Sequence, residues 1–161
     1  MTRLGVALAL LVTVLDQISK SWILADVMNP PTVITVTPFF NLVLVWNRGV
    51  SFGILNQSTV WIPWLLSALA AAICVGLFIW LRRAESRWLA TALGLIIGGA
   101  LGNLIDRLRF GAVVDFLDVH AFGYHWPAFN VADAAITVGV GVLLIDSLIT
   151  GREERKVEPP Q

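Results

Sequence analysis

The sequence predicts an all-α integral membrane protein with four transmembrane helices, a small extracytoplasmic β-sheet and an outer loop. Of its 161 residues, 57% are hydrophobic and only 14% are charged, and the mean hydropathy is +0.80. A soluble domain needs more polar surface, so the bilayer is the expected solvent. The formal net charge of zero argues against nucleic acid as a partner. One domain, residues 1–150, is enough for this length.

Four apolar stretches are long enough to span a bilayer, which takes about 20 mostly apolar residues in a helix. They are residues 4–24, 60–81, 88–105 and 131–149. The first follows Arg3, as the core of a secretory signal would. No small-residue cleavage site follows it, however, so we predict that it is retained as a helix. The charged segment 151–161, which ends Pro-Pro-Gln, is expected to be a disordered cytoplasmic tail.

The basic residues predict the orientation. Seven precede the first helix, follow the fourth or lie around the short link between the second and third: Arg3, Arg82, Arg83, Arg87, Arg152, Arg155 and Lys156. Three fall in the opposite connections: Arg48, Arg107 and Arg109. The positive-inside rule therefore places both termini in the cytoplasm. The longer connections then face outward. Residues 32–37 and 42–46 are rich in β-branched residues and predict strands, and 107–127 predicts a structured loop.

Polar residues inside the predicted helices need partners or a function. Asp16 and Lys20 are four apart on one helical face and can pair. They form either a structural ion pair or the support of a site on the outer side. Asn103, Asp106 and Arg107 share a face at the outer end of the third helix. They fit an ion pair at a helix end or a set of donors for a ligand.

The third helix also carries glycines at four-residue spacing, Gly94, Gly98 and Gly102. Such a stripe allows close approach of another helix, within one chain or between two copies.

Two aspartates stand beside apolar runs, where a carboxylate is costly and usually has a function. Asp115 lies in the outer loop and Asp133 near the start of the fourth helix. Two carboxylates can divide an acid role from a base role. A structural alternative exists for Asp133, because Asn130 and Asp133 have the spacing of an N-terminal capping box.

The sequence gives only weak indications of metal binding or of redox chemistry. Asp118, His120 and His125 share the outer loop, but they do not form the zinc-binding His-Glu-x-x-His pattern, so we predict no metal site. Cys74 is the single cysteine and stands in an apolar run, which excludes an internal disulfide.

Five motifs in this order resemble those of the lipoprotein signal peptidase family, also called signal peptidase II, of bacterial inner membranes. They are DQISK at 16–20, NRGVSFG at 47–53, GGALGNLIDR at 98–107, VVDF at 113–116 and FNVAD at 129–133. The resemblance runs from about Asp16 to Ile149. It implies an aspartic endopeptidase without cofactor, which removes signal peptides from diacylglyceryl-modified prolipoproteins by cutting before the lipidated cysteine.

The resemblance also implies residue roles. Asp115 and Asp133 match the catalytic pair. The positions that match substrate-binding residues are Asn47, Gly49, Asn103, Arg107 and Asn130. Asp16, Lys20 and Asp106 match positions with a structural role. We expect a monomer in contact with membrane lipid, with its active site toward the outer face. In such a pair one ionised carboxylate takes a proton from water and the protonated one hydrogen-bonds the scissile carbonyl.

Two other classes of protein fit parts of the pattern. A proton or ion transporter could use Asp16, Lys20, Asp106 and Asp133 as a relay, but transporters show internal repeats, and this sequence has no visible one. A structural membrane subunit would explain the glycines but not two separate polar motifs that face the same side.

Overall fold

The computed structural model describes residues 1–49 and 61–157. Within these ranges four long helices are apolar enough to cross a membrane. They are α1 (Thr2–Trp22), α2 (Ile62–Arg82), α3 (Arg87–Phe110) and α4 (Val131–Val157). The predicted spans are confirmed. Residues 50–60, which include the end of the NRGVSFG motif and Val60 of the second predicted span, lie outside the described residues, as do residues 158–161.

Helix α4 is longer than the sequence predicts. It continues to Val157, so residues 151–157 are helical where disorder was expected. This corrects that part of the prediction. Propagating an existing helix adds one hydrogen bond for each residue ordered, and Arg, Glu and Lys are good helix formers. Their charge therefore does not end the helix.

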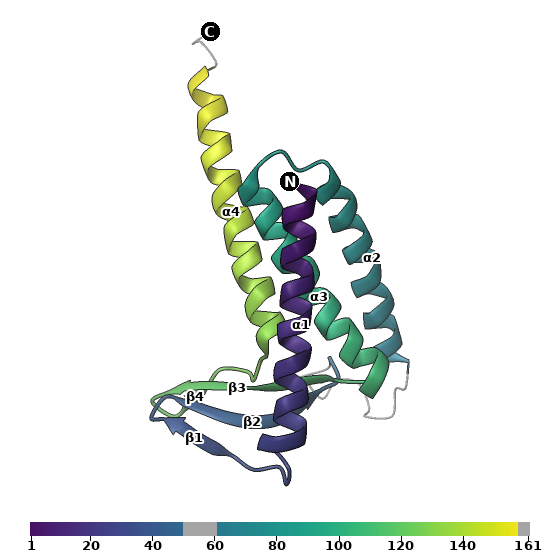
Figure 1. Cartoon of the computed structure of the whole chain (residues 1–161). Coiled ribbons are helices and arrows are strands. Elements are labelled where there is room, and N and C mark those ends of the chain that lie inside the picture. Colours follow the sequence, from purple (N-terminus) through teal and green to yellow (C-terminus); the bar gives the residue numbers. More distant parts are fainter. Residues whose placement is uncertain (50–60, 158–161) are drawn as a thin grey trace.

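Helix α3 is the centre of the bundle and packs against α1, α2 and α4 (Figure 1). Its glycines make this possible. A Cβ atom at Gly98 would lie 2.6 Å from the carbonyl oxygen of Ala9 in α1, and one at Gly99 would collide with that of Ala132 in α4. Backbone atoms cannot move aside as a flexible side chain can. The glycine stripe thus serves packing within this chain.

A four-stranded antiparallel sheet lies across one end of the bundle (Figure 1). Its strands, in spatial order, are β1 (Ile34–Thr37), β2 (Phe40–Asn47), β3 (Val113–Ala121) and β4 (Tyr124–His125). The two N-terminal strands confirm the prediction. Where the sequence predicts a loop at 107–127, β3 pairs with β2 along its length. The run VVDFLDVHA is rich in β-branched and aromatic residues, which suit a strand once a partner edge is available.

The sheet is attached to the helices by a small apolar cluster. Helix α1 continues as a π-helical turn, η1 (Ile23–Val27), whose Ile23 packs with Met28 and with Phe116 of β3. All three side chains are buried. Because Phe116 adjoins Asp115 in the chain, this cluster holds the strand that carries Asp115 against the end of the bundle. Both chain termini and the α2–α3 link lie at the opposite end (Figure 1).

Candidate active site

Asp133 lies in the first turn of α4 and forms the capping box that the sequence predicts. Its backbone N–H donates to Asn130 Oδ1 at 3.0 Å, and the N–H of Asn130 donates back to Asp133 Oδ2 at 3.2 Å. The positive end of the helix dipole also favours a carboxylate here. Asp133 is only partly buried. The capping role is therefore present in the structure, and it holds Asp133 without burying it completely.

Asp115 lies on β3 and is almost completely buried, with 1% of its surface exposed. Its carboxylate accepts hydrogen bonds from two amides, Asn47 Nδ2 at 2.9 Å and Asn130 Nδ2 at 2.7 Å. Asn47 reaches it because Asn47 pairs with Val113 and Val45 pairs with Asp115 across the β2–β3 ladder. Diagonal neighbours on one face of a sheet are within side-chain reach. Two neutral donors thus hold Asp115 in place.

Asn130 connects the two aspartates. Its side-chain amide donates to Asp115 through Nδ2 and accepts from the N–H of Asp133 through Oδ1. It is completely buried. Its orientation is set on both sides, because only one assignment of the amide nitrogen and oxygen satisfies both contacts. One side chain thereby bridges Asp115 and Asp133, which are eighteen positions apart in the sequence.

The pKa of Asp115 differs from that of an ordinary carboxyl group. Burial raises it from 3.8 to about 6, although the hydrogen bond from Asn47 lowers it and the nearby charge of Asp133 raises it further. Burial disfavours the charged form because the protein solvates a carboxylate less well than water does. Asp115 therefore takes up a proton at a higher pH than an ordinary aspartate does.

Asn103 of α3 links Asp133 to a buried cation. Lys20 Nζ donates to Asn103 Oδ1 at 3.1 Å, and Asn103 Nδ2 donates to Asp133 Oδ1 at 2.8 Å. Since an ammonium group can only donate, Lys20 compels the oxygen of the amide to face it. The amide nitrogen of Asn103 is then directed at Asp133.

Lys20 forms ion pairs with both Asp16 and Asp106, each at 2.8 Å. All three side chains are buried, and the predicted pairing of Asp16 with Lys20 is confirmed. Gln17, whose importance the sequence did not reveal beyond its place in the first motif, donates to Asp16 Oδ2 at 3.2 Å and to Asp106 Oδ1 at 2.9 Å. A polar residue facing protein within a spanning helix was the available signal.

This ion cluster also holds the backbone beside each candidate catalytic residue. Asp16 Oδ1 accepts the N–H of Ala132, which precedes Asp133, at 3.0 Å. Asp106 Oδ2 accepts the N–H of Val114, which precedes Asp115, at 3.1 Å. The cluster therefore does more than neutralise charges inside the helices. It positions the two chain segments that carry the aspartates.

Arg107 and Gly49 stand at the edges of the site. The guanidinium of Arg107 donates to the carbonyl oxygen of Asn103 at 3.4 Å and is within electrostatic reach of Asp133, Asp106 and Asp115. The N–H of Gly49 donates to Asn47 Oδ1 at 2.8 Å, and its φ of +82° suits glycine. This contact turns Asn47 so that its amide nitrogen faces Asp115.

The histidines of the outer segment lie away from this site. His125 Nδ1 contacts Asp118 Oδ1 at 2.9 Å, and Asp118 also accepts from Asn41 at 2.9 Å. Burial of Asp118 raises its pKa, but these hydrogen bonds outweigh that effect and leave the pKa below 3.8. The rings of His120 and His125 stack with centroids 4.8 Å apart. Among the described residues no three acidic, histidine or cysteine side chains are arranged to hold a metal ion.

Fold and site together define a polytopic membrane protein with a paired-carboxylate centre at one end of its bundle. The family model described as "Signal peptidase (SPase) II" matches residues 8–149. The chain belongs to this family and is a membrane-bound bacterial peptidase. Family membership decides against the transporter and structural-subunit alternatives.

Relatives and solved structures agree with this assignment. A lipoprotein signal peptidase of Methylorubrum extorquens (strain PA1) is 50% identical, over 91% of this chain and 86% of its own length. One from Azoarcus sp. (strain BH72) is 48% identical, over 94% and 86%. A structure titled "Bacterial membrane enzyme structure by the in meso method at 2.3 A resolution" superposes with a TM-score of 0.78 at 30% identity, covering 98% of this chain and 94% of that one.

Proposed function

We propose that this protein removes the signal peptide from diacylglyceryl-modified prolipoproteins by cutting before the lipidated cysteine. The observation that carries the proposal is the convergence of Asp115 and Asp133 on Asn130, at the sheet end of a four-helix membrane bundle. Membership of the signal peptidase II family and the relatives named lipoprotein signal peptidases support the substrate class. A peptidase of this kind works on a chain that remains in the bilayer.

The two aspartates have different surroundings, and from these we infer a different role for each. Asp133 stands at the start of a helix, where the dipole favours a carboxylate, and it is only partly buried, so we assign it the role of the base. Asp115 is buried with a pKa raised to about 6 by burial, so it holds the shared proton and acts as the acid. Such a pair titrates as a unit, and this division describes its singly protonated form.

Cleavage then follows a balanced sequence of proton transfers. Asp133 takes a proton from water while the water oxygen bonds to the scissile carbonyl carbon, and the Asp115 proton is hydrogen-bonded to the carbonyl oxygen. As the tetrahedral intermediate collapses, the carbon–nitrogen bond breaks and the leaving nitrogen receives the proton that Asp133 took. Asn130 and Asn103 keep both carboxylates aligned throughout, because each donates to one of them.

The proposed orientation places this site at the outer membrane surface and both termini in the cytoplasm. The seven-to-three distribution of basic residues supports it. So does the separation of the sheet from the chain termini and the α2–α3 link, which lie at opposite ends of the bundle (Figure 1). A lipidated substrate can keep its acyl chains in the outer leaflet while its cleavage point reaches the rim. Strands β1 to β3 then form a cradle for the extended chain. One copy supplies every residue of the proposed site, which supports a monomer.

The test is an assay of the purified protein on two peptides with the same prolipoprotein sequence, one carrying the diacylglyceryl group and one unmodified. We expect cleavage before the cysteine of the lipidated peptide alone, unaffected by a chelator. Failure to cut the lipidated peptide, or equal cutting of both, would overturn the substrate assignment. Cleavage lost on chelation would contradict the paired-aspartate mechanism and direct attention to His120 and His125.

A further inference from the structure

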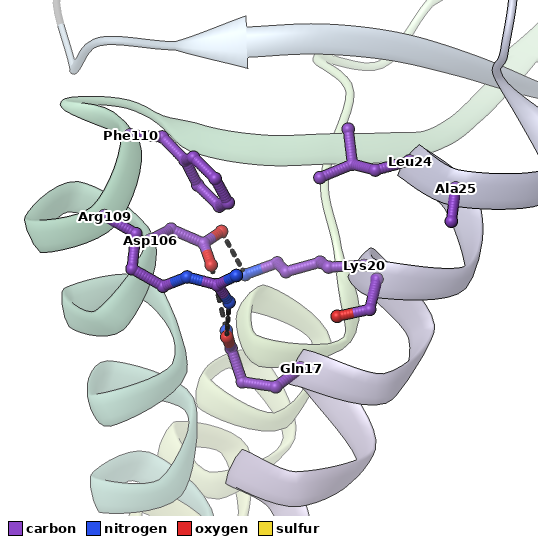
Figure 2. A pocket seen from close by; sticks show the side chains of 8 residues that line it. Gln17, Lys20, Leu24, Ala25, Asp106, Arg109 and Phe110 are labelled. Carbon is purple, nitrogen blue, oxygen red and sulfur yellow. Dashed lines mark hydrogen bonds and ion pairs between the residues drawn. The ribbon is translucent and has the colours of Figure 1, made fainter.

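A hollow lies between α1 and α3, beside the Lys20–Asp106 ion pair (Figure 2). Its volume is about 250 Å³. Its lining comes from the last turns of both helices and from η1: Gln17, Lys20, Ser21, Leu24, Ala25, Asp106, Arg109 and Phe110. The lining contains neither candidate catalytic aspartate, and the peptidase mechanism does not use the hollow.

Arg109 contributes a guanidinium group to this hollow. Within the described part of the chain, no carboxylate lies within ion-pair distance of its guanidinium, although Lys20 has two. One nitrogen of Arg109 donates to Gln17 Oε1 at 3.3 Å, and the guanidinium stands 4.7 Å from the centroid of the Phe110 ring. A guanidinium has five N–H donors, so most of them remain available.

The other charged groups of the wall are already occupied. Asp106 accepts hydrogen bonds from Gln17 and from the N–H of Val114, and it forms an ion pair with Lys20. Asp16, which is not part of the lining, forms a second ion pair with Lys20. Figure 2 shows Arg109 reaching from α3 toward Gln17 of α1, with the Asp106–Lys20 pair beside it. Arg109 is therefore the charged side chain of this lining without an ion-pair partner among the described residues, and its unused N–H donors complement a ligand with acceptor oxygens, such as a phosphate.

The position of the hollow narrows the class of anion. Arg109 lies in the last turn of the spanning helix α3 and is exposed, as are Ser21 and Phe110. Leu24 and Ala25 provide an apolar wall next to them. A cation and a hydroxyl above an apolar wall, at the end of a membrane span, match a phosphate group joined to acyl chains. The volume is below the ~300 Å³ at which typical ligand pockets begin, which suits a headgroup but not a whole lipid.

We propose that this hollow binds the headgroup of an anionic glycerophospholipid. The phosphodiester accepts hydrogen bonds from Arg109 and Ser21, and the first part of an acyl chain lies along Leu24 and Phe110. The ligand is a resident lipid of the outer leaflet and not the peptidase substrate. The proposal is independent of the proposed cleavage reaction.

Native mass spectrometry of the full chain in detergent tests this directly, with phosphatidylglycerol and phosphatidylcholine of identical acyl chains as probes. We expect wild type to retain phosphatidylglycerol preferentially and R109Q to retain about tenfold less, the loss of one charge-assisted contact. R83Q, at the other end of the bundle, is the matched control and should bind as wild type does. Equal retention by R109Q and wild type, or an equal loss in R83Q, would overturn the proposal.

Two further experiments test whether the lipid occupies this hollow and whether the ligand is a lipid or a soluble phosphate. L24W fills the apolar wall without changing any charge and should also reduce retention, while R109K keeps the charge and should preserve most of it. If L24W retains phosphatidylglycerol like wild type, the lipid does not occupy this hollow. Glycerol 3-phosphate provides the soluble phosphate. If it binds as tightly as phosphatidylglycerol, or if phosphatidylcholine binds equally well, the assignment to an anionic lipid is wrong.

Discussion

Two groups of aspartates adjoin each other in this protein, and they are held in different ways. Asp16 and Asp106 each contact Lys20 at 2.8 Å. Asp115 and Asp133 contact no cation in the described residues, and their side-chain partners are the amides of Asn47, Asn103 and Asn130. All four lie at the sheet end of the bundle.

This difference distinguishes carboxylates that support the structure from carboxylates that can take part in the reaction. Asp16 and Asp106 share one buried lysine, whose ion pairs fix the positions of both carboxylates. A carboxylate held by neutral amides keeps its orientation in either protonation state. It can therefore gain and lose a proton during a reaction. The ion cluster supplies rigidity to the backbone of the site, and the asparagines leave the aspartates free to react.

The largest expected effect comes from replacing either member of the amide-held pair. D115N and D133N should each lower kcat for the lipidated peptide by about 10³-fold or more, since each removes an acid or base. Asparagine fits the same space, but both oxygens of each aspartate accept an N–H here, so the new NH2 group faces a donor and the free energy of unfolding should fall by about 1–3 kcal/mol while the fold is retained. The measurement is single-turnover cleavage combined with thermal unfolding.

D118N is the matched control for this experiment. Asp118 lies on the same strand three residues after Asp115, but its partners are Asn41 and His125. D118N should cleave at nearly the wild-type rate. Comparable loss in D118N, or near-normal turnover by D115N or D133N, would remove the distinction between the two groups.

The second effect concerns stability. K20M leaves Asp16 and Asp106 buried without their cation, and we expect it to lower the free energy of unfolding by about 3–5 kcal/mol. Chemical or thermal unfolding in detergent measures it. H125A removes an ion-pair partner whose side chain is 56% exposed, so its expected cost is at most about 1 kcal/mol. Similar costs for the two variants would show that the Lys20 cluster is not the support we describe.

The smallest effect is a shift along the pH axis. The hydrogen bond from Asn47 lowers the pKa of Asp115, so N47L should raise that pKa above its value of about 6. Asp115 acts as the protonated member, so kcat/KM falls as the pH rises through this pKa. The alkaline limb of the pH profile of kcat/KM should therefore move to higher pH in N47L, even if the maximum value of kcat/KM also changes.

N41L removes the corresponding donor from Asp118 and should leave the limb where it is in wild type. A limb that stays in place in N47L, or moves to lower pH, would contradict the assignment of the acid to Asp115.

Much of the architecture can be read from the sequence because it depends on local pattern. Apolar length predicts the four spans, and the spacing of Asn130 and Asp133 predicts the capping box, since both are set by residues near in sequence. The pairing of Asp16 with Lys20 is local for the same reason. The sequence predicts a loop where β3 forms, because the strand that pairs with it, β2, comes from a distant segment.

What the chain determined by itself was therefore its spans, its caps and the residue types from which a site could be built. Only the tertiary structure brought Asp115 and Asp133 to the two sides of Asn130, joined Lys20 to Asn103 across 83 positions, and tied Asp16 to the backbone of Ala132 across 116. Such contacts depend on how closely α3 packs against α1 and α4. That closeness is set by glycine backbones meeting carbonyl groups of other helices, which no local pattern specifies.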